Sequence, residues 1–90
     1  MWTDRMEINV TPRFIKSYKK LHKEIQEKAK VKEAVFRKNP FDKRLKTHKL
    51  LGKEKESWAF WVDYSYRIKF IFLTKDDVLF LDIGTHDFYK

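Results

Sequence analysis

The second half of the chain contains three runs of apolar residues separated by two short polar turns, and this pattern restricts the fold most. The runs cover residues 58–64, 67–73 and 78–83. The first run alternates at period two, which is typical of a strand with two different faces; its larger side chains are at Trp58, Phe60, Val62 and Tyr64. Short turns join neighbouring antiparallel strands. The third run is apolar at nearly every position, so we expect a central strand covered on both faces.

The first forty residues predict one strand and two helices. Residues 6–10 alternate apolar and polar side chains, as a strand does. Thr11-Pro12 is a helix start, with Thr as N-cap and Pro at the first helical position. An apolar stripe then recurs at steps of three and four, and predicts one helix face; it comprises Phe14, Tyr18, Leu21, Ile25 and Ala29. A shorter helix is expected over 32–37, ended by Asn39-Pro40.

These elements predict an α+β fold with the order β-α-α-β-β-β. Two N-terminal helices would pack on a curled, mainly antiparallel sheet of four strands, as a two-layer sandwich. Residues 1–90 are expected to form a single domain. A chain this small needs a dense core, and aromatic residues, at 17% of the sequence, provide one.

Several classes of protein are disfavoured by composition. The chain has no cysteine, which excludes disulfides and zinc–cysteine sites. No run approaches the ~20 apolar residues of a membrane span, and the N-terminus lacks the apolar stretch of a signal peptide. We therefore expect a cytoplasmic protein without a membrane partner.

The charge is strongly positive. Lys and Arg number 21 against 13 Asp and Glu, which gives a formal net charge of +8. This favours a polyanionic partner, an acidic protein or a nucleic acid. The alternative is that the lysines on the helices form an ordinary solvated face.

Three polar residues fall at the ends of the predicted strands. His48 lies in the basic connection 41–55, Arg67 begins a strand, and His86 follows the last strand. In a curled meander the start of one strand and the end of its neighbour lie at the same sheet edge. Arg67 and His86 are therefore expected to meet there, with the connection that carries His48 lying across the same edge.

These side chains match the needs of RNA cleavage. Attack by a 2′-OH on the adjacent phosphate requires a base, an acid, and a cation that holds the extra charge on phosphorus. His48, His86 and Arg67 would supply them without a metal or cofactor, and the sequence leaves open which histidine is the base. Nearby cations are candidates to bind RNA: Lys43, Arg44, Lys46, Lys49 and Lys69.

Each residue also has a purely structural interpretation. His48 would be solvated, Arg67 would form an ion pair with Asp63 or Asp87, and the terminal His86 would pack over the sheet edge. His22, on the lysine-rich helix, is expected to have no catalytic role. The three histidines include no close pair that would chelate zinc.

Three segments resemble the RelE/ParE superfamily of toxins from type II toxin–antitoxin systems. Residues 39–52 resemble its NP…rLk.H.L.G stretch, residues 58–68 resemble its W..rv…yRi.f strands, and residues 84–89 resemble its GtHd..Y ending. One difference is Asp82, which stands where several relatives carry a basic residue.

The resemblance implies a ribosome-dependent mRNA endonuclease of the YoeB and YafQ type. It maps the catalytic set onto His48, Arg67, His86 and Tyr89. It also implies a small cognate antitoxin as partner, with the ribosome and mRNA as targets. The alternative is a non-nucleolytic toxin or binding module of the same fold, either a gyrase inhibitor like ParE or an inactive member.

Overall fold

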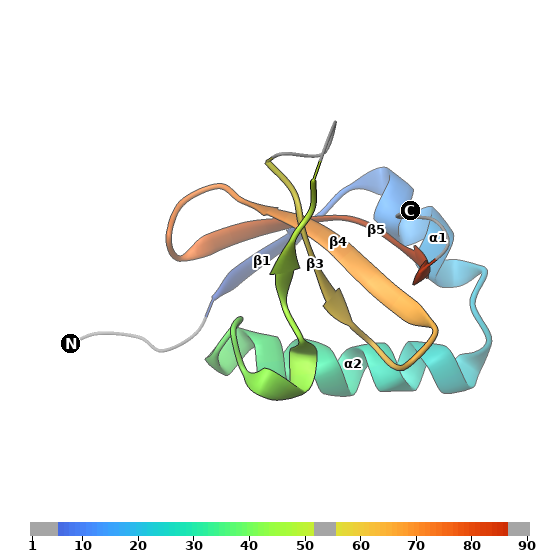
Figure 1. Ribbon diagram of the computed structural model, residues 1–90. Coiled ribbons are helices and arrows are strands. Elements are labelled where there is room, and N and C mark those ends of the chain that lie inside the picture. Colours follow the sequence, from blue (N-terminus) through green and yellow to red (C-terminus); the bar gives the residue numbers. More distant parts are fainter. Residues whose placement is uncertain (1–5, 52–55, 87–90) are drawn as a thin grey trace.

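The computed structural model describes residues 6–51 and 56–86, which form a sheet with helices on one side (Figure 1). The elements are β1 (Glu7–Val10), α1 (Pro12–Lys19), α2 (Lys23–Lys38), the 3₁₀ turn η1 (Lys43–Leu45), β2 (His48–Lys49), β3 (Trp58–Trp61), β4 (Tyr66–Phe72) and β5 (Asp77–Thr85). The predicted α+β class is confirmed.

The sheet has the strand order β1-β5-β4-β3-β2, and only β1 and β5 run parallel. It has five strands, whereas the sequence predicted four. The additional strand, β2, consists of two residues that pair with β3. Two residues are too few to produce an alternating pattern, so this strand could not be recognised within the basic connection 41–55.

The start of the first helix is as predicted. The Thr11 hydroxyl accepts a hydrogen bond from the backbone N–H of Phe14 at 2.9 Å, and Pro12 occupies the first helical position. The same hydroxyl donates to the carbonyl of Leu81, which ties the start of α1 to β5.

The predicted boundary between the two helices was wrong. Residues 20–22 interrupt the helical conformation, and α2 begins at Lys23 rather than at residue 32. His22 is the exposed N-cap of α2 and makes no capping bond with its side chain. Across the break, the Gln26 side chain donates to the carbonyl of Tyr18 at 2.9 Å. The apolar stripe continues through the break because both helices face the same core, so periodicity could not reveal it.

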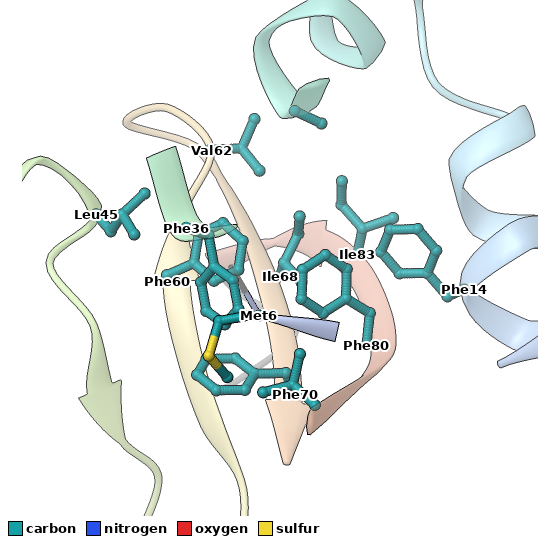
Figure 2. Close-up of a cluster of buried hydrophobic side chains, with 12 residues drawn as sticks. Met6, Phe14, Phe36, Leu45, Phe60, Val62, Ile68, Phe70, Phe80 and Ile83 are labelled. Carbon is teal, nitrogen blue, oxygen red and sulfur yellow. The ribbon is translucent and has the colours of Figure 1, made fainter. Parts of the chain in front are cut away.

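The core is built around Phe36 of α2, whose side chain is fully buried (Figure 2). Its ring lies 4.9 Å from Phe60, 5.0 Å from Phe70 and 5.4 Å from Phe80, measured between ring centroids. The three partners belong to β3, β4 and β5. One helical side chain therefore contacts three neighbouring strands and fixes which face of the sheet is covered.

Side chains of β4 alternate between the two faces of the sheet. Ile68 and Phe70 lie in the core, so Arg67 and Lys69 lie on the opposite face. On β5 the residues Leu79 and Leu81 are only half-buried. This strand is interior, as predicted, but its second face is not fully covered, because α2 packs on the core face. Among the described helices, none is both long and apolar enough to span a membrane.

We predict that Phe36→Ala lowers the free energy of unfolding by about 3–5 kcal/mol, the usual cost of removing a buried Phe side chain. Chemical denaturation would measure this change. The matched control is Val31→Ala on the same helix, where the side chain is exposed; it should stay within about 0.5 kcal/mol of wild type. Equal losses for the two variants would contradict the central position of Phe36.

Candidate functional site

The three residues selected from the sequence surround one hollow of about 290 Å³. Its walls are formed by His48, Leu50, Ala59, Trp61, Arg67 and His86. His48 begins β2, Arg67 is the second residue of β4, and His86 directly follows β5. The strand order thus joins segments that lie up to 38 positions apart in the chain.

The register of the strands explains where the hollow forms. His48 pairs with Ala59, and Ala59 pairs with Lys69 on its other side. Paired residues direct their side chains to the same face of a sheet. The small, buried Ala59 leaves room between the longer side chains of its two neighbours, and this room is part of the hollow.

His48 is held in one tautomer. Its Nδ1 lies 2.9 Å from the carbonyl oxygen of Lys46. A carbonyl oxygen only accepts hydrogen bonds, so Nδ1 carries the proton and Nε2 of the neutral ring has the lone pair. Lys46 has left-handed backbone angles (φ 50°, ψ 41°), which are uncommon for a residue other than Gly. This conformation directs the carbonyl at the ring.

Arg67 is a buried cation on the wall of the hollow, with 8% of its surface exposed. Its Nη1 donates to the carbonyls of Asp63, Tyr64 and Tyr66, at 2.9, 2.8 and 3.2 Å. The guanidinium carbon lies 4.0 Å from the centre of the Trp61 ring. Carbonyl dipoles and the aromatic face both favour a positive charge, so they offset the cost of burying the guanidinium.

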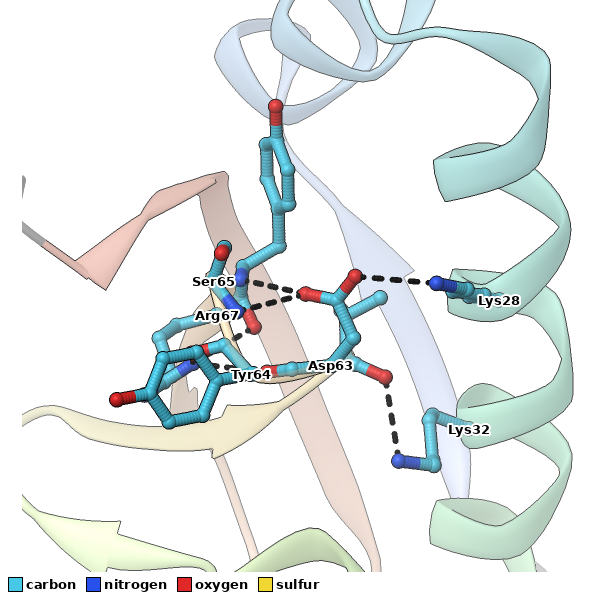
Figure 3. Close-up of polar contacts among 8 residues, drawn as sticks. Lys28, Lys32, Asp63, Tyr64, Ser65 and Arg67 are labelled. Atoms are coloured by element: carbon cyan, nitrogen blue, oxygen red, sulfur yellow. Dashed lines mark hydrogen bonds and ion pairs between the residues drawn. The ribbon is translucent and has the colours of Figure 1, made fainter.

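The carboxylate of Asp63 caps the β3–β4 turn instead of pairing with Arg67. Its Oδ1 accepts hydrogen bonds from the backbone N–H groups of Ser65 and Tyr66, and its Oδ2 lies 3.4 Å from Nζ of Lys28 (Figure 3). Partial burial raises the pKa of Asp63, but the bonds from Tyr66 and Ser65 and the charge of Lys28 together bring it below its ordinary value. The Arg67–Asp63 ion pair of the structural interpretation is therefore not formed, and Arg67 bonds the backbone carbonyl of Asp63 instead.

His86 is exposed, and its backbone N–H donates to the carbonyl of Ser65 at 2.8 Å. This bond attaches the end of β5 to the β3–β4 turn. Asp87, the other partner suggested for Arg67, and Tyr89, the fourth predicted catalytic residue, lie outside the described residues.

The five predicted RNA-binding cations are not among the residues that line the hollow. Lys46 lies nearby, since its Nζ is 5.2 Å from the ring centre of Trp61, and Lys69 shares the sheet face of Arg67. Lys49 follows His48 on β2, so its side chain lies on the other face, where Nζ is 6.0 Å from the ring of Trp58. Lys43 is exposed in η1.

Arg44 is paired with Asp42. The guanidinium makes two bonds of 2.9 Å to the carboxylate. The Arg44 side chain and its backbone N–H lower the pKa of Asp42 to about 2, and the carboxylate raises the pKa of Arg44. Both groups are therefore charged at neutral pH, and Arg44 contributes less net positive field than its charge suggests.

Two features of the site were missed from the sequence. Trp61 was interpreted only as part of a strand. It directly follows the core residue Phe60, so the alternation already placed its side chain on the sheet face away from the core. The second is the ion pair of Asp82 with Arg13 of α1, in which the buried carboxylate lies 3.0 Å from Nε. No sequence signal joined residues 69 positions apart. Within 6–51 and 56–86, no group of three or more His, Cys, Asp or Glu residues is placed to hold a metal ion.

We predict that the cap formed by Asp63 stabilises the protein most above pH ~4, the ordinary pKa of an Asp carboxyl. Because folding lowers this pKa, the stabilisation is present above the unfolded value and is lost as pH falls toward the folded value. Asp63→Asn keeps an oxygen acceptor but removes the charge. Denaturation curves should give a higher free energy of unfolding for wild type than for Asp63→Asn at pH 7, and a smaller difference between the two at pH 3. Ser65→Ala, a change without a titrating group in the same turn, is the control. A difference between wild type and Asp63→Asn that is constant from pH 7 to 3 would contradict this prediction.

Comparison with known proteins gives matches only at the level of structure. Neither models of protein families nor curated protein sequences match this chain. Among solved structures, the YoeB/ParE toxin from Agrobacterium tumefaciens is similar with a TM-score of 0.75 at 15% identity, over 90% of this chain and 99% of that one.

Two further similar structures are toxin–antitoxin complexes. The E. coli DinJ–YafQ complex matches with a TM-score of 0.73 at 22% identity, over 92% of this chain and 94% of that one. The archaeal RelE–RelB complex from Pyrococcus horikoshii matches with a TM-score of 0.72 at 14% identity, over 90% and 94%. Coverage is nearly complete on both sides, and the chain therefore has the fold of the RelE/ParE toxin superfamily, in agreement with the resemblance seen in its sequence.

Proposed function

We propose that this chain is the toxin of a type II toxin–antitoxin system and that it cleaves mRNA on the ribosome. The observation that carries the proposal is the meeting of His48, Arg67 and His86 around one hollow. Three different segments contribute these residues, and they are the side chains that transfer of a phosphate to a 2′-OH needs. The similarity in fold to YoeB, YafQ and RelE structures supports the same function.

In the proposed reaction the 2′-oxygen attacks the adjacent phosphorus while the bond from phosphorus to the 5′-oxygen breaks. The products are a 2′,3′-cyclic phosphate and a 5′-hydroxyl. A base takes the 2′-OH proton, and an acid gives a proton to the leaving 5′-oxygen. Because a 2′-OH is required, the activity would be restricted to RNA.

The tautomer of His48 favours it as the base. With Nδ1–H donated to the carbonyl of Lys46, the lone pair on Nε2 is the one that would accept the proton of the 2′-OH. The same hydrogen bond would stabilise the imidazolium that forms. His86, which also lines the hollow, would then start the reaction as the imidazolium and act as the acid.

Arg67 would stabilise the charge that develops on the phosphate oxygens. Its guanidinium is fixed before substrate arrives, by three carbonyls and the Trp61 ring. A cation that is already oriented needs no reorganisation during the reaction, and this is the most effective form of electrostatic catalysis. Lys69, on the same sheet face, would add positive field.

We further propose a small acidic antitoxin as the cognate partner. The net charge of +8 would steer such a partner to the toxin. The similar DinJ–YafQ structure is a toxin–antitoxin complex, and the similar RelE structure is a complex with RelB. A segment that orders on binding would cover the hollow or distort it. The same charge would favour binding to ribosomal RNA while the mRNA is cleaved, and the proposed site of action is cytoplasmic.

Induced expression tests the proposed function directly. We predict that the wild-type protein stops growth within minutes and that mRNA 5′ ends accumulate inside translated frames. Co-expression of the neighbouring open reading frame should restore growth. Arrest with intact mRNA and blocked replication would instead support the gyrase alternative.

The roles of the residues can be tested in ribosome-bound cleavage assays. We predict that His48→Ala and His86→Ala each lower the cleavage rate by roughly 10²–10⁴-fold, the range for one general acid or base. Arg67→Ala should lose about 10²–10³-fold through weaker charge stabilisation. His22→Ala, which changes an exposed histidine outside the hollow, should cleave like wild type.

Circular dichroism and denaturation must accompany the Arg67 variants, since this side chain also bonds the β3–β4 turn. Arg67→Lys keeps the charge but loses the fork of donors, so it should recover only part of the rate. Full activity of folded His86→Ala would refute its role as the acid.

A further inference from the structure

The β3–β4 turn is held more firmly than a surface turn requires. On one side, α2 reaches it twice, through the Lys28–Asp63 ion pair and through Lys32, whose Nζ donates to the carbonyl of Val62 at 3.1 Å. On the other side, Nη1 of Arg67 bonds the turn carbonyls of Asp63 and Tyr64 and the carbonyl of Tyr66, the first residue of β4. Figure 3 shows the two lysines approaching from α2 while Arg67 lies on the opposite side of the turn.

This rigid turn presents one large aromatic side chain to solvent. Tyr64 is 78% exposed, although its backbone carbonyl is held at 2.8 Å by Arg67. Its ring is inclined at 85° to that of Trp61, with 6.0 Å between the centroids. In Figure 3 the Tyr64 ring lies on the side of Arg67, away from α2. Since Trp61 lines the hollow, the exposed ring stands at its rim.

Single exposed aromatic residues are common and need no special explanation. Tyr64 differs because its backbone carbonyl is held by Arg67 and because its ring contacts Trp61, whose own ring has two cations beside it. Arg67 lies 4.0 Å from the Trp61 ring centre, and Nζ of Lys46 lies 5.2 Å from it. Aromatic rings among fixed cations are the pattern by which proteins bind single-stranded nucleic acid, with the rings stacking on bases and the cations contacting phosphates.

We propose that Tyr64 is an RNA-binding residue that stacks on one nucleobase of a single strand whose phosphate lies in the hollow. The proposal rests on the proposed function, and it adds the residue that positions the nucleotide beside the scissile bond. A phosphate near Arg67 brings the base of an adjacent nucleotide next to the rim. Because the ring is mostly exposed, it has surface available for this base. Stacking accepts every base, so Tyr64 would contribute affinity and register more than sequence preference.

The test is a binding measurement that does not depend on cleavage. The probes are fluorescent RNA hexanucleotides with 2′-O-methyl groups, which remove the attacking hydroxyl. One series contains a single abasic position moved along the strand. Wild type, Tyr64→Ala, Tyr64→Phe and Leu73→Ala are titrated at low salt. Leu73 is the control because it is an exposed apolar residue on the other hairpin turn, between β4 and β5.

Stacking predicts one position where loss of the base weakens wild-type binding about 5- to 150-fold, the equivalent of 1–3 kcal/mol per stacked base. In Tyr64→Ala the same abasic change should leave the binding affinity almost unchanged, since the ring that stacks on this base is already absent. Tyr64→Phe and Leu73→Ala should behave like wild type.

The inference is overturned if no abasic position couples to Tyr64→Ala, or if wild type does not bind the hexanucleotides. It is also overturned if Tyr64→Ala leaves RNA binding unchanged and weakens only the complex with the product of the neighbouring gene, which would assign Tyr64 to a protein interface. Coupling without ribosome-dependent cleavage would retain the stacking role and reject the endonuclease. Cleavage without coupling would retain the endonuclease and reject the stacking role.

Discussion

The alternation of side chains along β4 is the constraint on which the rest of the structure depends. Ile68 and Phe70 are buried with Phe36 on the helical face, so Arg67 and Lys69 must lie on the other face. A shift of one residue in register would place a guanidinium in the core and a Phe in the hollow. The packing of the core therefore determines the position of the charges in the candidate site.

The burial of Arg67 shows how the site and the turn stabilise each other. A cation removed from water needs compensation, and carbonyls and an aromatic ring contribute it here. The Asp63 carboxylate does not pair with the guanidinium, which bonds the backbone carbonyl of Asp63 instead. Asp63 meanwhile caps the turn that supplies these carbonyls. The carboxylate thus supports the cation indirectly, by fixing the backbone.

Much of the fold was predictable because its signals are local. Thr11-Pro12 predicted the start of α1, and Asn39-Pro40 predicted the end of α2. Period-two alternation predicted β1 and β3, and apolar runs between short polar turns predicted β4 and β5. The break between α1 and α2 was not predictable from the apolar stripe, since both helices face one core. It depends on contacts such as that of Gln26 with the carbonyl of Tyr18, which form only when the helices pack. The two-residue strand β2 likewise exists because β3 lies beside it.

For the candidate site, the sequence by itself determined which groups were available and that strand ends would gather His48, Arg67 and His86. Their residue types and their positions relative to the strands are local properties of the chain. Only the tertiary structure decided that Nδ1 of His48 faces the carbonyl of Lys46, that Arg67 bonds carbonyls rather than the Asp63 carboxylate, and that Lys49 lies on the opposite face from Lys69. These outcomes depend on strand register and on burial, which determine the neighbours of each polar atom. Packing determines which residues distant in the chain become neighbours, and a local pattern of residues does not predict this.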